Sequence, residues 1–469
     1  MLGAMSKRVW VRAGVLGIVV LAALAAAALL PVSSALRVGA GMAAHNLCSS
    51  TFISGLPVQQ TRHELVDALI GPAARWLRVQ IDGEGRRVET RWLFERAAAR
   101  FTPGYGCRLN FGQTLVELPT LPPQPTLPPQ PTAEDLLTTE TPAPAVGAAL
   151  RAALDRVFAE NPGTASRRVK AVVIVKNGRV VAERYAPAFG PDTPVTSFSV
   201  AKSITNALLG ILVRQGTISM TAPAPVPEWS GLRDPRGRIT PDNLLRMASG
   251  LDAEENASGF DPASRMFYDS NDMGAYSASR PLKSPPGTVW AYTSNNTLII
   301  DRMMAGIVGG GPAKFREFAQ TELFAPLGMS HVTLEFDGAG TFIGASHAYA
   351  TPRDFARFGL LYLNDGKAPD GRRILPEGWA AYSRRSTLGS SYGAGFWTND
   401  GPSEDAAYRV AKGFPKDGFF ASGNLGQRIY IIPSEQIVIT RFGYSTGPTF
   451  GIGADLELIA AAIAALKTG

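Results

Sequence analysis

Helical and strand-like hydrophobic patterns alternate through the C-terminal two thirds of the chain. Between Ser199 and Arg214 apolar residues recur three and four positions apart, the spacing of a buried helix. Strand-like runs flank the central region: Ala171 to Val175, Arg179 to Tyr185, Arg428 to Ile432 and Ile437 to Arg441. Asn177-Gly178, between the first two of these runs, is a strong hairpin signal.

Further helices are predicted over Val146 to Glu160 and over Leu456 to Leu466. Strands at both ends of the region and a helix-rich middle predict an antiparallel sheet assembled from distant parts of the sequence. Helices would flank that sheet. The pattern therefore favours an α+β fold of the α/β/α sandwich type over residues 146–469.

The N-terminus has the pattern of a targeting segment. Lys7, Arg8 and Arg12 precede an apolar run from Ala13 to Leu30, which indicates a signal peptide or signal anchor over residues 1–40. The run is just long enough to span a bilayer, so anchoring in the inner membrane by residues 13–32 and cleavage near Ser33-Ser34-Ala35 both remain open. The flanking cations favour export of the rest of the chain to a periplasmic or other extracytoplasmic location.

Residues 41–117 are predicted to form a small accessory module of mixed patterning. Trp76 to Ile81 indicates a strand and Glu89 to Arg100 a helix. The module holds both cysteines, Cys48 and Cys107, which in an exported protein are expected to form a disulfide. Two unpaired buried thiols are the alternative. Residues 118–145 are proline-rich and are expected to act as a semi-rigid linker.

Bulk properties exclude several function classes. The 469 residues carry a net charge of +7, but the cations are scattered, so nucleic-acid binding is not expected. The histidines, His45, His63, His331 and His347, have no paired metal-ligand spacing, so neither a metal site nor a cofactor is predicted.

The chemistry is indicated by Ser199-Val-Ala-Lys202 at the start of the buried helix. Positions three apart share a helix face, so the Lys202 amine can approach the Ser199 hydroxyl. A lysine whose charge is disfavoured by burial can take the serine proton during nucleophilic attack. Alone, the four-residue pattern also fits an ordinary helix start.

The segment Pro286-Gly-Thr-Val-Trp-Ala-Tyr-Thr-Ser-Asn-Asn296 supports the catalytic interpretation. Together with Ser199 and Lys202 it resembles the penicillin-recognising serine hydrolases, which include class C β-lactamases, DD-peptidases and related esterases. The resemblance implies that Tyr292 shares proton transfer with Lys202. It also implies a β-lactamase/transpeptidase-like fold with an all-helical subdomain. Ser294 fills the position of the family's asparagine, and Asn295 follows one place later.

The family's third element is a strand ending in Lys-Thr-Gly or His-x-Gly. Lys467-Thr468-Gly469 is rejected because it follows an apolar helix and ends the chain. The resemblance instead assigns Asn424-Leu425-Gly426 to this place, with Gln427 on an edge strand. The oxyanion hole would then combine the N–H groups of Ser199 and Gln427.

The implied function is hydrolysis of linear esters or small amides through an acyl-serine. Three stretches place the chain nearest the 6-aminohexanoate-dimer hydrolase and esterase branch: Leu323 to Met329, Gly340 to Ser346 and Ile374 to Trp379. A neutral Asn424 in place of lysine predicts poor turnover of anionic β-lactams. Activity on β-lactams or cell-wall peptides, or a non-catalytic peptide-binding role, are the alternatives, and the sequence leaves the oligomeric state open.

Overall fold

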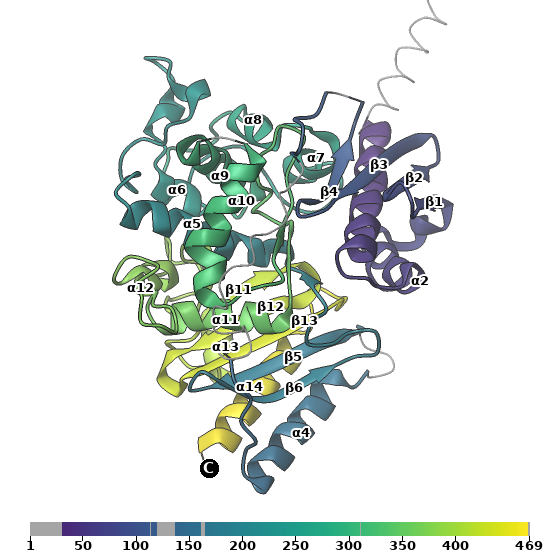
Figure 1. The fold of residues 1–469 in the computed structure, drawn as a ribbon. Coiled ribbons are helices and arrows are strands. Elements are labelled where there is room, and N and C mark those ends of the chain that lie inside the picture. The colour runs from purple at the N-terminus through teal and green to yellow at the C-terminus, as the bar shows by residue number, and fades with distance from the viewer. Residues whose placement is uncertain (1–30, 113, 120–136, 161–164, 310, 468–469) are drawn as a thin grey trace, which may run out of the picture.

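The computed structural model describes residues 31–112, 114–119, 137–160, 165–309 and 311–467 (Figure 1). The apolar run predicted from Ala13 to Leu30 lies outside these residues. So do residues 120–136 of the proline-rich stretch. Within the described ranges no helix combines the length and apolar character needed to span a bilayer.

Residues 146–469 are called the catalytic region after their predicted role, and a six-stranded antiparallel sheet forms its centre, in the order β10-β11-β12-β13-β5-β6. β5 and β13 pair although they come from opposite ends of the region. Both are buried along nearly their whole length, as expected for β-branched strands covered on both faces. The strands are β5 Val169–Lys176, β6 Arg179–Tyr185, β10 Trp397–Thr398, β11 Phe419–Gly423, β12 Gln427–Ile432 and β13 Ile437–Gly443.

Helices cover both faces of this sheet (Figure 1). One face packs against α4 (Pro144–Phe158) and α14 (Ile452–Lys467), and the other against α5 (Ala201–Arg214) and α11 (Pro352–Leu363). The α/β/α sandwich predicted from the sequence is therefore confirmed. Asn177 and Gly178 turn the β5–β6 hairpin, both with positive φ, as a two-residue primed turn requires.

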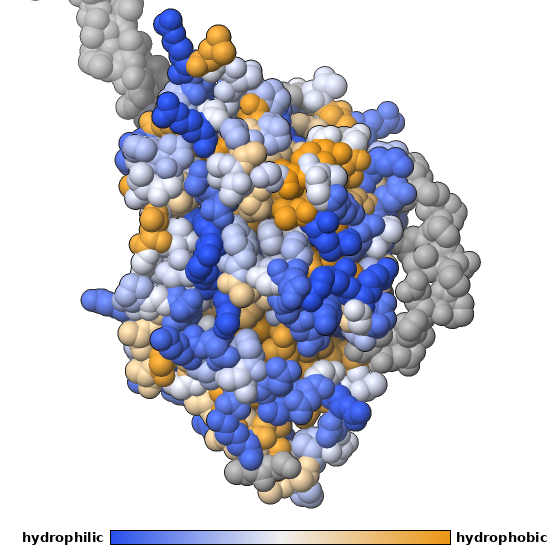
Figure 2. Space-filling model, turned by 90° about the vertical axis from the view of Figure 1, so that its left-hand side faces the viewer, coloured by the Kyte–Doolittle hydropathy of each residue, from blue (hydrophilic) through white to orange (hydrophobic). Residues whose placement is uncertain are grey.

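A helical region and a small sheet complete the catalytic region. Sheet β7-β9-β8 joins the start of α5 to the region before α11. The remaining elements are α6 Pro241–Leu245, α7 Pro262–Asp269, α8 Met273–Ala278, α9 Ser294–Val308, α10 Pro312–Ala319, α12 Trp379–Arg384, α13 Glu404–Ala411, β7 Val195–Thr196, β8 Thr333–Leu334 and β9 Ala348–Ala350. In the view of Figure 2, hydrophilic residues cover most of the surface, interrupted by small hydrophobic groups.

The N-terminal module differs from its prediction in two ways. A continuous helix spans 31–52, so the boundary expected between residues 40 and 41 falls inside it. The helix predicted over Glu89 to Arg100 is wrong, because this segment forms two strands of the sheet β1-β2-β3-β4. Burial alternates along both strands, and this tertiary pattern overrides the helix propensity of the alanines and arginines. The module's elements are α2 Val58–Thr61, α3 Asp67–Ile70, β1 Leu77–Asp82, β2 Arg87–Trp92, β3 Glu95–Thr102 and β4 Gly106–Asn110.

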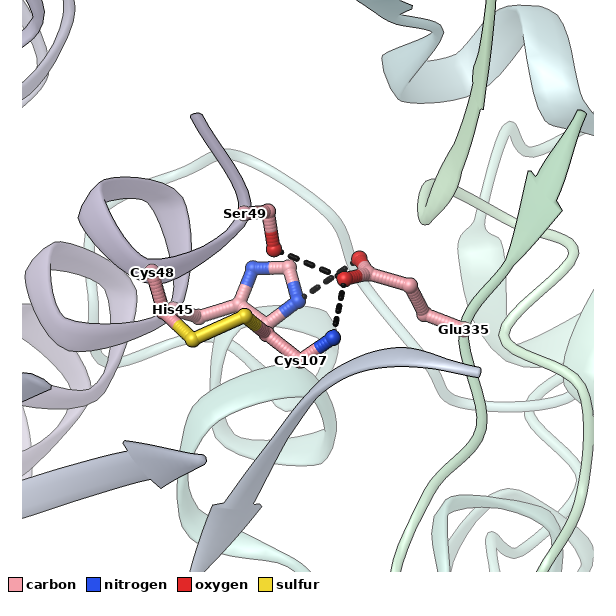
Figure 3. Close-up of a disulfide and its surroundings, with 5 residues drawn as sticks. All are labelled: His45, Cys48, Ser49, Cys107 and Glu335. Atoms are coloured by element: carbon pink, nitrogen blue, oxygen red, sulfur yellow. Dashed lines mark hydrogen bonds and ion pairs between the residues drawn. A yellow bond between two sulfur atoms is a disulfide. The ribbon is translucent and has the colours of Figure 1, made fainter. Parts of the chain in front are cut away.

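The disulfide between Cys48 and Cys107 joins helix 31–52 to β4, with Cα atoms 6.1 Å apart (Figure 3). Both cysteines are fully buried. The module also contacts the catalytic region directly. Arg37, for example, pairs with Asp269 of α7 at 3.2 Å. The end of the predicted linker is docked as well, because the Glu140 N–H donates to the Val180 carbonyl of β6.

Candidate active site

Ser199 lies in a tight turn between β7 and α5. The chain makes a 3-10 turn over Phe198–Val200 and enters α5 at Ala201, so Ser199 stands just before the helix rather than in its first turn. Phe198 has φ = 42°, in the left-handed region, which costs a non-glycine residue about 1–3 kcal/mol. The surrounding structure fixes this conformation and places Ser199 at the wall of a cavity of about 860 Å³.

Lys202 projects from the first turn of α5 onto Ser199. Its Nζ donates to Ser199 Oγ at 3.1 Å, to Ser294 Oγ at 2.8 Å and to the Ala345 carbonyl at 2.9 Å. The residue is only 2% exposed. Burial lowers the pKa of Lys202 to about 8, although the Glu255 and Asp301 carboxylates act in the opposite direction. The neutral amine is therefore far more populated near neutral pH than it is for an ordinary exposed lysine, although the charged form still predominates at pH 7.

Tyr292 approaches Ser199 from the segment that leads into α9. Its hydroxyl lies next to the Ser199 side chain, and Lys202 Nζ lies 4.8 Å from the ring centroid. The ring packs against Tyr392 and Trp397 at centroid distances of 5.6 and 5.7 Å. Burial, reinforced by the Glu255 carboxylate, raises the pKa of Tyr292 well above its usual value. The phenol is therefore protonated at neutral pH and can donate a proton.

Of the two residues considered for the asparagine position, only Ser294 faces the lysine. Its hydroxyl is the acceptor nearest to Lys202 Nζ. The Asn295 side chain instead donates to Ser277 Oγ of α8 at 3.0 Å. Consecutive residues in the first turn of a helix point about 100° apart, so placing Ser294 toward α5 turns Asn295 toward α8.

The third motif lies earlier on the hairpin than the sequence predicted. Gly423, the last residue of β11, pairs with Gln427, and Asn424-Leu425-Gly426 forms the loop between them. A Cβ atom added at Gly423 would lie 2.5 Å from the Ser197 carbonyl oxygen and 3.0 Å from Ser199 N. Gly423, followed by Asn424, is thus the glycine that closely approaches the serine.

Gln427 and Gly426 do not line the cavity, which corrects their predicted role. β12 is an inner strand, not an edge strand. The Gln427 amide donates to the Gly443 carbonyl at 2.6 Å, and the Gly426 carbonyl accepts from Arg441 at 2.8 Å. The loop turns the chain away from the serine before these residues are reached. Ser422, Gly423 and Asn424 line the cavity instead.

Glu255 is a site residue that sequence reasoning missed. Its carboxylate accepts a hydrogen bond from the Ser294 backbone N–H at the start of α9. Among the described residues that line the cavity, Glu255 is the only one with a charged side chain. Its sole sequence signal is an acidic pair shortly after Ser249-Gly250-Leu251, which carries no spacing relation to Ser199.

The accessory module supplies part of the cavity wall. Val32, Leu36 and Met42 of helix 31–52, together with Trp92 of β2, face the same cavity as Ser199. Phe267 and Tyr268 of α7 continue this wall. Apolar side chains from two separate parts of the chain thus surround the space in front of the serine.

An antiparallel sheet between helical layers, with a serine-lysine turn beneath one strand, is the architecture of the β-lactamases and penicillin-binding proteins. The beta-lactamase family model matches residues 154–463. The chain therefore belongs to the beta-lactamase family, a family of hydrolases, as the sequence motifs predicted.

Individual relatives agree with this assignment. The 6-aminohexanoate-dimer hydrolase of Paenarthrobacter ureafaciens is 28% identical over 45% of this chain, and the match spans only 55% of that relative's length. A Bacillus anthracis structure, provisionally named a 6-aminohexanoate-dimer hydrolase, superposes with a TM-score of 0.56 at 20% identity, covering 72% of this chain and 90% of the other. A family VIII carboxylesterase reaches a TM-score of 0.51 at 15% identity, covering 70% and 99%.

Proposed function

We propose that the protein is an exported serine hydrolase that cleaves linear ester or small amide bonds through an acyl-serine intermediate. The observation that carries this proposal is the contact of Lys202 Nζ with Ser199 Oγ at 3.1 Å, with the Tyr292 side chain next to the same serine. A lysine with a lowered pKa is a suitable base for a serine that has no histidine partner.

In the proposed acylation step, Ser199 Oγ attacks the substrate carbonyl carbon while its proton passes to the Lys202 amine. The N–H groups of Ser199 and Asn424 would stabilise the oxyanion, because Gly423 brings this strand end against the serine backbone. The proton then passes through the Tyr292 hydroxyl to the leaving alcohol or amine. In deacylation, water attacks the acyl-serine, its proton goes to the same base, and the Ser199 hydroxyl is restored.

The cavity favours uncharged acyl groups. Its walls are mainly apolar, and no lysine or arginine is among the described residues that line it. With Gly423 as the motif glycine, Ala421 stands where Lys-Thr-Gly has its lysine, and Ser422 retains a hydroxyl. A carboxylate-bearing β-lactam would lose a charge-assisted hydrogen bond and would meet the Glu255 carboxylate. The names of the relatives, an amide hydrolase and a carboxylesterase, fit the same substrate class.

Active-site labelling tests the nucleophile. A serine-directed fluorophosphonate is expected to label the full chain and not the Ser199→Ala variant. Ser264→Ala, which alters another cavity serine, is the matched control and is expected to label normally. Equal labelling of the Ser199→Ala variant would refute the assignment.

A substrate panel tests the specificity. Short-chain nitrophenyl esters and linear amides are expected to be turned over, and cephalosporins at least tenfold more slowly. A cephalosporin rate equal to the ester rate would contradict the substrate class. Labelling of Ser199 without turnover of any substrate would instead favour a non-catalytic peptide-binding role.

We also propose that the catalytic region functions outside the cytoplasm. The buried Cys48–Cys107 disulfide supports this location, because such bonds persist in oxidising compartments. Protease treatment of intact cells and of spheroplasts measures the location, and intact-mass analysis determines whether residues near Ala35 are the new N-terminus. Protection from protease in spheroplasts would contradict export.

A further inference from the structure

Three buried metal-binding side chains meet where the accessory module joins the catalytic region. His45 belongs to helix 31–52, Glu335 follows β8, and His347 precedes β9. They are 2%, 0% and 4% exposed, respectively. One ligating atom from each residue lies within 4.8 Å of the other two. Sequence spacing could not predict this group, because about 290 and 300 residues separate His45 from its partners.

Most polar atoms of this group lack hydrogen-bond partners. Within the part of the chain that the structure describes, neither ring nitrogen of His45 or His347 is hydrogen-bonded, and Glu335 Oε2 accepts no hydrogen bond either. His45 Nε2 comes within 2.9 Å of Oε2, but the two atoms are not aligned as a hydrogen bond. Buried polar atoms normally have hydrogen-bond partners. A buried group with this many atoms that lack one therefore indicates a site for a bound partner.

The Glu335 carboxylate is held in a fixed orientation. Its Oε1 accepts from Ser49 Oγ and from the Cys107 backbone N–H, both at 2.7 Å (Figure 3). Gly106 permits this contact, because a Cβ atom there would lie 2.5 Å from Glu335 Cγ. The adjacent Cys48–Cys107 disulfide fixes both donors. Hydrogen bonds of this kind orient metal-ligating carboxylates and leave the second oxygen for the metal.

We propose that His45, Glu335 and His347 bind a divalent transition-metal ion of the zinc type. Two imidazoles and one carboxylate are a ligand set that zinc accepts. Tetrahedral bonds of about 2.0–2.1 Å place donor atoms roughly 3.4 Å apart, so the side chains need to close by less than about 1.5 Å. The histidine rings, now stacked at 4.0 Å, would turn so that one nitrogen of each converges on the ion.

A fourth ligand has room to bind. A small cavity of about 10 Å³ touches both histidines, close to the space that one water molecule needs. The site would be structural rather than catalytic. Phe267 and Tyr268 pack against His347 on one side and line the Ser199 cavity on the other. Metal binding would therefore fasten the module that forms part of the cavity wall.

Metal binding by the full chain tests this proposal. Chelator-treated protein is titrated with Zn²⁺ against a chromophoric chelator, and metal content is measured by mass spectrometry. One equivalent of Zn²⁺ is expected, with a rise in melting temperature. His45→Gln and His347→Gln are expected to weaken binding by roughly a hundredfold or more. His63→Gln, at an exposed position, is the matched control and is expected to bind normally.

Spectroscopy of the native protein tests the site without any variant that could fail to fold. X-ray absorption of the zinc-loaded native protein is expected to show only nitrogen and oxygen ligands near 2.0–2.1 Å, including two imidazoles. Absence of stoichiometric Zn²⁺ binding by the native chain would overturn the site. So would sulfur ligands, or unchanged affinity in both cluster variants. None of these readouts depends on hydrolytic activity, so the site and the proposed function can fail separately.

Discussion

Lys202 is expected to set the pH dependence of acylation. Only the neutral amine can accept the Ser199 proton, and burial lowers the pKa of this lysine to about 8. The acylation rate should therefore rise about tenfold per pH unit below pH 8 and level off above it. Single-turnover kinetics with a nitrophenyl ester, in buffers of constant ionic strength, measure the profile.

Glu255→Gln provides the control for this electrostatic argument. The Glu255 carboxylate raises the pKa of Lys202, so its removal should lower that pKa and move the rising limb toward lower pH. A shift toward higher pH, or a native profile without a rising limb near pH 8, would exclude Lys202 as the base.

Ser294 is predicted to position Lys202. Ser294→Ala removes a hydrogen bond to the amine, worth about 1.5–3 kcal/mol, so kcat should fall on the order of tenfold to a hundredfold with little change in KM. Asn295→Ala is the matched control. Its side chain bonds to Ser277, so this variant should lose stability and keep its turnover. If Asn295→Ala lost turnover and Ser294→Ala kept it, Asn295 rather than Ser294 would be the residue that positions Lys202.

At the scale of elements, the close contact between β11 and the serine turn depends on Gly423. In Gly423→Ala, the new Cβ would press against the Ser197 carbonyl and Ser199 N. The strand end and the turn must separate, so the oxyanion donors lose their alignment. We expect kcat to fall at least a hundredfold, comparable to loss of one oxyanion donor.

Gly426→Ala separates a local catalytic effect from a general packing effect. Gly426 has φ = 88°, and an added Cβ would lie 2.5 Å from Arg441. This variant should lose about 1–3 kcal/mol of stability by overpacking and strain, with a nearly normal rate per folded molecule. Thermal melts and active-site titration measure both quantities. Equal catalytic loss in the two variants would refute a specific role for Gly423.

Helix α14 is anchored to the sheet by a buried ion-pair group. Asp455 lies 2.6 Å from Arg428 and 3.3 Å from Arg441, and it accepts a hydrogen bond from Tyr430. Asp455→Ala leaves two buried guanidinium groups without their carboxylate and should cost about 3–5 kcal/mol of unfolding free energy. Asp370→Ala, which removes an exposed pair with Arg372, should change it by less than about 1 kcal/mol. Urea denaturation compares the two, and similar losses would contradict the argument.

At the scale of the whole molecule, the disulfide links module stability to the cavity. Its cysteines are separated by 59 positions, and a loop of that length implies about 4 kcal/mol of stabilisation. A Cys48→Ser/Cys107→Ser double variant should melt at a lower temperature. It should also show a higher KM for long-chain esters, because helix 31–52 lines the cavity.

A short ester that does not reach this wall serves as the internal control and should be hydrolysed at a nearly normal rate. Reduction of the native protein with dithiothreitol should reproduce the long-chain effect if the reductant reaches the buried bond. An unchanged KM in the double variant would mean that the module does not shape the substrate site.

Features that depend on local periodicity could be predicted from the amino-acid sequence. The buried runs of β5, β12 and β13, the Asn177-Gly178 turn and the apolar spacing of α5 were sufficient to predict the sandwich. Ser199 and Lys202 share one short segment, so a single helical turn fixes their contact. Tyr292 lies far from Ser199 in the sequence, and only the resemblance to the family motif predicted its role. The positions of the two cysteines indicated their pairing.

Which residues of each motif face the serine depends on how distant segments pack together. The choice of Ser294 over Asn295 depends on how α9 is rotated against α5 and α8. The choice of Gly423 over Gly426 depends on where the β11–β12 hairpin turns. Glu255 and the cluster of His45, Glu335 and His347 are brought together by packing between segments far apart in the chain. Such contacts leave no local periodicity, and for this reason the sequence could not predict them.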